Sequence, residues 1–325
     1  MVGGGSIGKR HLQNLGKFEG ISRAVVEPDR DRRMALLRDD HVAGFDNVGD
    51  GLGWDPDVLV IATPSHLHLG QASVAARRGC HLFVEKPLFH SGQDAEVLIY
   101  EVEARALVSM VACNFRFHPG PARIKEVLDN GVLGRVFFAR VYGGSYLPSW
   151  HPDEDYRKGY SANASMGGGC VLDGIHLIDL AHWFLGDIET VTGTVGRVGD
   201  LGIDVEDIAS IVNVHASGQR SEVHIDYLQR FRVLGCHLAG SEGSVVWDWE
   251  VPEVRLATLA QGGWKSEMLG KGWEINQMYL DEMHHFLDCV RQGRQTCNPI
   301  REAAKVTNAA LSVKRSSEER RFVEV

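Results

Sequence analysis

The chain has 325 residues, of which 44% are hydrophobic and 24% charged, a composition typical of globular proteins that argues against a disordered chain. Its formal net charge of −9 gives no sign of a basic surface that would bind nucleic acid or anionic lipid. No apolar run approaches the ~20 residues that span a bilayer. The cysteines form no Cys-x-x-Cys pair and the N-terminus resembles no export signal, so we expect a cytoplasmic protein with reduced thiols.

The first third of the chain alternates short apolar segments with segments of helical length. Segments rich in Val, Ile, Leu and Phe predict buried strands at residues 24–27, 57–63, 80–85 and 107–114. Helices are predicted between them, at residues 66–79 and 91–105. This alternation predicts a parallel sheet with helices on both faces.

After about residue 115 the pattern changes. Residues 120–130 predict a helix, residues 136–146 a long strand, and residues 171–185 another helix. Closely spaced alternating segments then predict a largely antiparallel sheet, with strands at residues 189–197, 208–216, 221–228, 236–239, 244–249 and 254–259. Helices at residues 274–291 and 301–314 close the chain. We therefore predict two domains, residues 1–115 and 116–325.

A glycine-rich segment at the N-terminus fits the pattern G-x-G-x-x-G and leads into a helical stretch. We expect it to bind the pyrophosphate of a dinucleotide through a tight turn and exposed N–H groups, formed by Gly3, Gly5, Ser6, Ile7 and Gly8. Only two residues precede this segment, whereas a Rossmann fold has a central strand of about five residues there. We therefore expect the natural chain to start further upstream, and a longer form to bind cofactor more tightly and melt at a higher temperature.

An acidic residue lies at the spacing that a dinucleotide-binding fold requires. Glu27 ends a predicted strand 19 residues after Gly8, close to the roughly 20-residue offset of a ribose-binding carboxylate. A carboxylate at this position repels a 2′-phosphate and favours NAD. The arginines between residues 30 and 33 leave NADP as an alternative, unless they are solvated helix-surface residues.

Two predicted strands end in proline turns. Thr63-Pro64, with His68, follows one strand, and Glu85-Lys86-Pro87 follows the next. Ligands of open α/β sheets bind at the carboxyl ends of strands, so we predict that these residues contact the cofactor. Pro87 restrains the backbone and allows a cis peptide bond. Lys86 could then hydrogen-bond a reacting hydroxyl or transfer a proton, with a solvated surface lysine as the alternative. A capping or packing role is the alternative for His68.

Together with residues 114–119 and 167–179, these motifs resemble the Gfo/Idh/MocA oxidoreductase family over nearly the whole chain. The Glu-Lys-Pro turn combined with a later Asp/His helix is the specific part of the resemblance. It implies a doubly wound Rossmann domain followed by an α/β domain with a large open sheet. In the family this sheet often supports oligomers, so we expect a homodimer or homotetramer. The resemblance also implies that Lys86, Asp173 and His176 match the catalytic lysine and the Asp/His pair.

The predicted helix at residues 171–185 carries Asp173, His176 and Asp179 at three-residue spacing. Neighbouring members of this series can touch, but Asp179 should point away from Asp173 and is expected to be structural. The near-neutral intrinsic pKa of histidine suits His176 to act as a general base, with a buried core histidine as the alternative. With Cys170, these side chains would fan around half a helix, so we expect no zinc site.

The loop before this helix combines aromatic rings with an arginine. Trp150 and Tyr156 could stack on a sugar, and Arg157 could pair with a carboxylate or phosphate, with packing inside the loop as the alternative. The loop resembles that of a sugar-related subgroup of the family. We predict that these three residues, and Arg116 from residues 114–119, bind the substrate.

The motifs predict an NAD(P)-dependent oxidoreductase that transfers a hydride between the cofactor and a secondary alcohol carbon of a sugar, sugar acid, inositol or nucleotide-sugar. Lys86 and His176 would exchange the hydroxyl proton while Asp173 orients one of them. One alternative is redox-assisted elimination or glycoside cleavage with tightly held NAD. Another is a sensor of sugar and cofactor without enzymatic activity, since a fold does not fix a function.

Overall fold

The computed structural model describes residues 1–39, 41–92, 95–270 and 272–325. Its contacts divide the chain into two units, Met1–Cys113 with Ile275–Ala304 and Asn114–Glu274 with Lys305–Val325. The first boundary lies two residues before the predicted one. The prediction also assigned residues 275–304 to the second domain, because local sequence patterns do not show which unit a C-terminal helix packs against.

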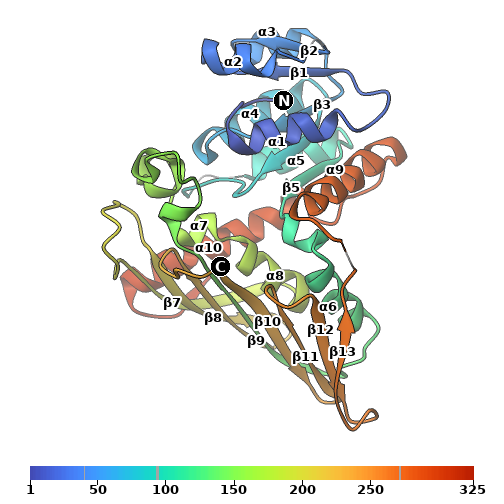
Figure 1. Cartoon of the computed structure of the whole chain (residues 1–325), viewed down its shortest axis with the longest axis vertical. Helices are drawn as coiled ribbons and strands as arrows, with labels where there is room; N and C mark the ends of the chain where they lie inside the picture. The colour runs from blue at the N-terminus through green and yellow to red at the C-terminus, as the bar shows by residue number, and fades with distance from the viewer. Residues whose placement is uncertain (40, 93–94, 271) are drawn as a thin grey trace. The chain divides into compact units, whose positions relative to one another are not determined.

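The first unit contains the predicted parallel sheet of a Rossmann-type fold (Figure 1). Its parallel strands form two groups: β2 (Val42–Phe45) pairs with β1 (Arg23–Val26), and β3 (Val58–Ile61), β4 (His81–Glu85) and β5 (Ser109–Ala112) follow one another in a second group. Val2 bridges Val26 of β1 and Ile61 of β3, so it occupies the central position. The strands are largely apolar because both faces of the sheet are covered; Val25 and Val84, for example, are completely buried.

Helices flank this sheet: α1 (Ser6–Leu15), α2 (Arg30–Leu36), α3 (Val48–Gly53), α4 (His68–Arg77), α5 (Glu96–Ala104), α9 (Ile275–Gln292) and the start of α10 (Ile300–Glu319). Residues 93 and 94, inside the helix predicted at 91–105, lie outside the described residues. Helix α9 buries a face that includes Met283 and Phe286, and Phe286 packs edge-on against Phe83 of β4. Within the described ranges, no helix combines the length and apolar character needed to cross a membrane.

The second unit is built on a sheet for which the described residues supply nine strands, in the order β13-β12-β11-β10-β6-β9-β8-β7-β14. The strands are β6 (Val136–Gly144), β7 (Ile188–Gly196), β8 (Ile208–His215), β9 (Arg220–Asp226), β10 (Val233–Gly240), β11 (Gly243–Asp248), β12 (Glu253–Thr258), β13 (Gly263–Met268) and β14 (Val323–Glu324). Only β6 and β9 pair in parallel; the other neighbours are antiparallel. The predicted fold class is therefore confirmed.

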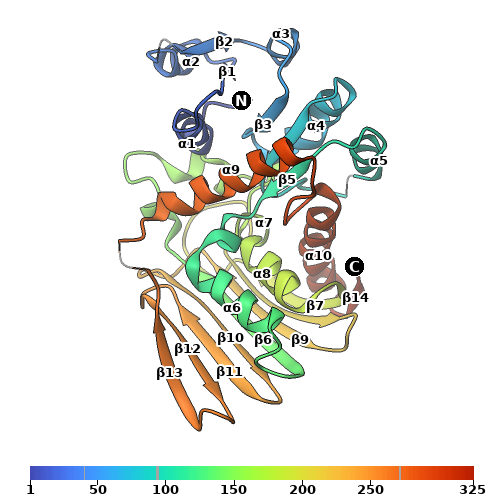
Figure 2. The same ribbon diagram turned by 90° about the vertical axis from the view of Figure 1, so that its right-hand side faces the viewer.

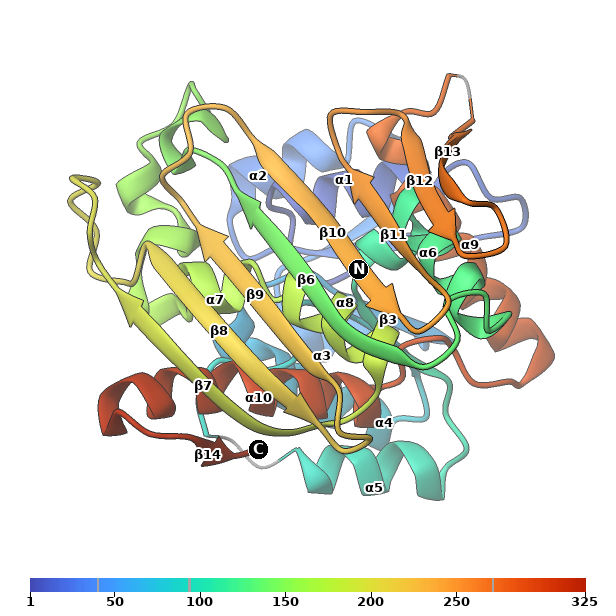
Figure 3. The same cartoon turned by 90° about the horizontal axis from the view of Figure 1, so that it is seen from below.

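Helices pack on one face of this large sheet. Figures 2 and 3 show α6 (Pro119–Asp129), α8 (His176–Leu185) and α10 on that side. Alternate residues of the central strands, such as Val141 of β6 and Val223 of β9, point into the core beneath these helices. The opposite face, toward the viewer in Figure 3, carries no helix from the part of the chain that the structure describes.

The helix predicted at residues 171–185 is two helices. α7 (Cys170–Asp173) ends at Gly174, and α8 begins at His176. A Cβ atom on Gly174 would lie 2.5 Å from Cγ2 of Ile225 in β9, so a glycine is required where the chain approaches the sheet this closely. Asp173 and His176 thus belong to different helices. The two residues are still three positions apart in the sequence, but no continuous helix joins them, contrary to the prediction.

Candidate active site

The glycine-rich segment before α1 has the geometry of a phosphate-binding turn. Gly3 has a φ of +94°, which favours glycine. A Cβ on Gly8 would lie 2.1 Å from the carbonyl oxygen of Gly3, so the turn closes only around glycine. At Gly5, the N-cap of α1, a Cβ would meet nothing within 4 Å. A dinucleotide pyrophosphate can therefore approach the N–H groups of Ser6 and Ile7 at the positive end of the helix.

Glu27 lies directly beside this turn. Its carboxylate accepts the N–H of Gly4 at 2.8 Å and the N–H of Asp29 at 3.0 Å, and its side chain is buried. Because a carboxylate has about four acceptor positions, a ribose hydroxyl could still donate to it. The residues of the first unit therefore fit a bound dinucleotide, and the ribose contact of Glu27 remains a prediction.

The two proline turns follow β3 and β4, as predicted. Lys86 is half-buried between the buried residues Glu85 and Pro87, and the Lys86–Pro87 peptide bond is cis. His68 is buried, with one ring nitrogen 2.8 Å from the carbonyl oxygen of Pro87 and the other 2.8 Å from that of Thr63. Both ring nitrogens already contact the protein backbone, so the predicted cofactor contact of His68 finds no support in this geometry.

In the second unit, a cavity of about 140 Å³ brings the predicted Asp/His pair together. Asp173 and His176 both line it, and the predicted substrate residue Trp150 lines it as well. Phe115, Ser145, Asp226, Tyr227 and Arg232 add aromatic, polar and charged groups to the wall. A small cavity with apolar rings and a few polar groups is the usual form of a small-molecule site.

Three hydroxyl groups hold the carboxylate of Asp173. Tyr160 donates to it at 2.9 Å, Ser161 at 2.7 Å and Tyr227 at 3.1 Å. These three donors fix the orientation of the Asp173 carboxylate, whose oxygens serve as hydrogen-bond acceptors. Burial, together with the Asp173 charge, raises the pKa of the Tyr227 hydroxyl well above its ordinary value, which keeps this hydroxyl a donor.

Aromatic rings surround His176 and Trp150. The imidazole of His176, the first residue of α8, lies against the ring of Phe115 with a centroid distance of 4.7 Å. Trp150 meets Tyr227 edge-on at 5.4 Å and donates its indole N–H to Ser145 at 2.8 Å. Flat apolar rings next to fixed polar groups suit a ligand that has both C–H faces and hydroxyls.

Other predicted substrate residues lie outside this cavity. Arg116 makes a buried two-point ion pair with Asp179, with nitrogen–oxygen distances of 2.8 and 2.7 Å. This pairing fits the predicted structural role of Asp179. The guanidinium of Arg116 is buried in the same ion pair and does not line the cavity. Tyr156 donates its hydroxyl to the backbone, and exposed Arg157 pairs with Asp155. Substrate binding by Arg116, Tyr156 and Arg157 is therefore not supported.

Sequence patterns did not identify the hydroxyl groups around Asp173. Tyr160 and Ser161 come from one short 3₁₀ turn before α7, and Tyr227 follows β9, 54 residues after Asp173. No periodicity links these positions. The only available signal was the cluster of Tyr and Ser residues in the loop that precedes the Asp/His segment.

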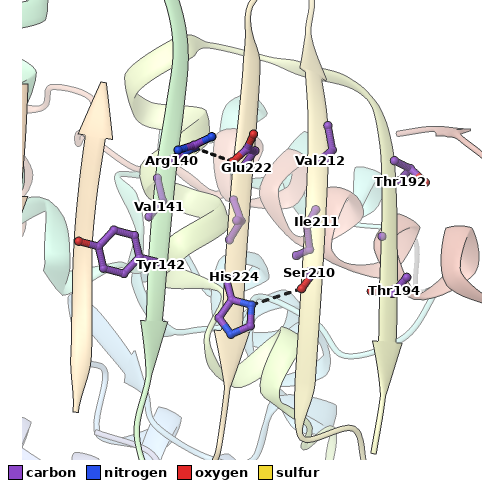
Figure 4. Close-up of a pocket in the computed structure, with 12 residues that line it drawn as sticks. Arg140, Val141, Tyr142, Thr192, Thr194, Ser210, Ile211, Val212, Glu222 and His224 are labelled. Atoms are coloured by element: carbon purple, nitrogen blue, oxygen red, sulfur yellow. Dashed lines mark hydrogen bonds and ion pairs between the residues drawn. The ribbon is translucent and has the colours of Figure 1, made fainter. Parts of the chain in front are cut away.

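A second, larger groove of about 540 Å³ lies on the open face of the sheet (Figure 4). Arg140 of β6 pairs there with Glu222 of β9 at 2.7 Å, and Ser210 of β8 contacts His224 at 3.3 Å. None of the predicted site residues lines this groove. The cavity at Asp173 and His176 is therefore the candidate active site.

Comparison with known proteins agrees with this architecture. Residues 1–113 match the family model described as oxidoreductase family, NAD-binding Rossmann fold, and residues 122–246 match the model of the GFO/IDH/MocA C-terminal domain. Levoglucosan dehydrogenase of Pseudarthrobacter phenanthrenivorans is 26% identical, over 90% of this chain and 89% of that protein. Myo-inositol 2-dehydrogenase of Thermotoga maritima is 25% identical, over 100% and 97%. A solved structure of levoglucosan dehydrogenase with NADH shares the fold, with a TM-score of 0.90, 22% identity and coverage of 100% and 97%.

Proposed function

This chain belongs to the Gfo/Idh/MocA family of NAD-binding oxidoreductases, and from that premise we propose that it transfers a hydride between NAD and a secondary alcohol carbon of a sugar-like substrate. The substrate classes are sugars, sugar acids, inositols and nucleotide-sugars. Relatives named as dehydrogenases of levoglucosan and myo-inositol support a polyhydroxylated ring.

The observation that carries the proposal is the fixed carboxylate of Asp173 next to His176 in one cavity. An ionised carboxylate accepts hydrogen bonds from substrate hydroxyls or from a protonated base. The rings of Phe115 and Trp150 offer apolar surface to the C–H face of a sugar.

In the oxidation direction, the substrate hydroxyl loses its proton to His176 or Lys86, and the hydride leaves the same carbon, so the alcohol becomes a carbonyl. Bound NAD supplies the hydride acceptor. Asp173 orients the basic group and stabilises its positive charge after it has taken the proton. In the reduction direction, the same groups return the proton to the carbonyl oxygen.

The test is a panel of sugars, sugar acids, inositols and nucleotide-sugars, each incubated with the full chain and NAD, with NADH formation followed by absorbance. We expect net NADH formation with at least one class. Lys86→Met should abolish this turnover and leave NADH binding largely intact, whereas Lys17→Met, at an exposed position of the same unit, should behave like the wild type. Full turnover by Lys86→Met would remove Lys86 from the mechanism.

A further inference from the structure

Two buried histidines contact the segment that carries Lys86, and neither is part of the reaction proposed above. His11 lies in α1, directly after the glycine turn, and is completely buried. His68 begins α4, directly after the Thr63-Pro64 turn, and is also buried. Both helices thus connect a predicted cofactor-binding turn to the Lys86 segment.

His11 acts on the N-terminal side of Lys86. Its Nε2 lies 2.7 Å from Oε1 of the buried Glu85 carboxylate, and Oε2 of the same carboxylate accepts the backbone N–H of Lys86 at 3.2 Å. The ring of His11 is held edge-on by Phe83 and Tyr279. Glu85 therefore connects a fixed imidazole to the peptide group of Lys86.

His68 acts on the C-terminal side. Its Nδ1 lies 2.8 Å from the carbonyl oxygen of Pro87, and its Nε2 lies 2.8 Å from that of Thr63. Carbonyl oxygens only accept hydrogen bonds, and burial lowers the pKa of His68, so its neutral ring has one N–H to donate. The ring lies between the turn after β4 and the turn after β3, and it donates either to Pro87 from Nδ1 or to Thr63 from Nε2.

We propose that His11 and His68 are positioning residues that fix the direction of the Lys86 side chain without touching substrate. The backbone on both sides of Lys86 is held by these contacts, so loss of either contact lets the lysine rotate away from the position it needs. The inference rests on the proposed function of Lys86. It adds two residues, His11 of α1 and His68 of α4, which both position Lys86.

The atoms involved provide matched substitutions. An asparagine amide nitrogen replaces Nδ1 of histidine, and a glutamine amide nitrogen replaces Nε2. His68→Asn therefore keeps a donor for Pro87, whereas His68→Gln keeps only the donor for Thr63. At the other site, His11→Gln keeps a donor for Glu85, and His11→Asn does not.

We expect kcat to fall by about 10- to 100-fold in His68→Gln and His11→Asn, with the Kd for NADH changed less than about twofold, because misplacement of a catalytic group by about 1 Å costs this much. His68→Asn and His11→Gln should retain more of the wild-type kcat. A purely structural role would instead lower cofactor binding and kcat in all four variants alike, and that result would overturn the proposal.

A second readout needs no substrate. In the full chain with ¹³C-methylated lysines, the Lys86 resonance is the one that Lys86→Met removes, and its titration reports the surroundings of the Lys86 Nζ atom. We expect the midpoint to move in His68→Gln and His11→Asn and to stay near wild type in the conservative pair. An unchanged midpoint in all four variants overturns the proposal. Full turnover by Lys86→Met would instead refute the catalytic role of Lys86, while the titration still decides whether the histidines position it.

Discussion

Tyr227 is the residue through which the candidate site can be tested most directly. Its hydroxyl donates to Asp173 and lines the cavity. Tyr227→Phe keeps the ring but removes this donor, and a hydrogen bond to a charged group contributes about 1.5–3 kcal/mol. We expect kcat/KM to fall by about 10-fold or more, since 1.4 kcal/mol corresponds to a factor of ten. The control is Tyr156→Phe, whose hydroxyl donates to the backbone outside the cavity. Equal kinetics for the two variants would contradict the role assigned to Tyr227.

His118 makes the stability of the second unit depend on pH. Its Nδ1 accepts the N–H of Gly120 and caps α6, and its ring packs among Trp247, Trp249 and Trp273. Burial, assisted by the positive charge of Arg232, lowers the pKa of His118 to about 4. The cap needs the unprotonated nitrogen, so proton uptake breaks it.

The sign of this effect follows from the two pKa values. Below its ordinary pKa of about 6.5, His118 takes up a proton in the unfolded chain but not in the folded one. Its contribution to stability is therefore complete above pH ~6.5 and is lost as the pH falls toward ~4, by on the order of 3 kcal/mol. Urea unfolding followed by tryptophan fluorescence at pH 7 and pH 5 should show about 2 kcal/mol of this loss. His118→Asn keeps a capping oxygen but cannot titrate, so its stability should change less between the two pH values; an equal change would exclude His118 as the source.

The junction between α7 and α8 depends on a single glycine. A Cβ on Gly174 would lie 2.5 Å from Ile225 and 2.8 Å from the carbonyl oxygen of Cys170. Gly174→Ala forces these elements apart, and such overpacking typically costs about 1–3 kcal/mol. We expect a lower melting temperature together with reduced kcat, because Asp173 and His176 flank the junction. Gly196→Ala is the control, since a Cβ there meets nothing within 4 Å. Equal melting temperatures for the two variants would count against the steric argument.

Sequence patterns predicted some of the strands and helices correctly and missed others. The strongly apolar strands β3, β4 and β5 were predicted because complete burial leaves a continuous apolar run. β13 was missed because most of its side chains are exposed, so it has no apolar alternation. β2 is short and contains Gly44, which weakens the same signal. The break between α7 and α8 at Gly174 could have been predicted, because a glycine inside a helical pattern lowers confidence in a continuous helix.

The site residues, too, were only partly predictable from the sequence. The glycine turn, Lys86, Asp173 and His176 were predicted because each lies in a recognisable motif or at a strand end. The hydroxyls around Asp173 come from a loop and from the end of β9, and only the folded chain brings them together. Arg116 was assigned to the substrate because an arginine near a motif suggests an anion site. A buried partner, Asp179, cannot be recognised from spacing alone.

The open face of the large sheet has the properties expected of a surface between two copies of the chain. It is broad and follows neighbouring strands, and no helix from the described ranges covers it. Val212 and Tyr142 lie there with threonines and the Arg140–Glu222 pair, so the face mixes apolar and paired polar groups. Such a mixture suits the self-complementary contact of a twofold-symmetric dimer.

We therefore expect a homodimer or homotetramer that uses this face. Val212→Glu places an unpaired charge on the open face, and a charge buried between two chains without a partner is strongly unfavourable. The wild-type chain should elute in size-exclusion chromatography with light scattering at the mass of two or four chains, and Val212→Glu should shift the population toward one chain. Val198→Glu, on an exposed position outside the groove, is the matched control and should keep the wild-type mass. A single-chain mass for the wild type would refute the expected oligomer, and an unchanged oligomer in Val212→Glu would place its interface elsewhere.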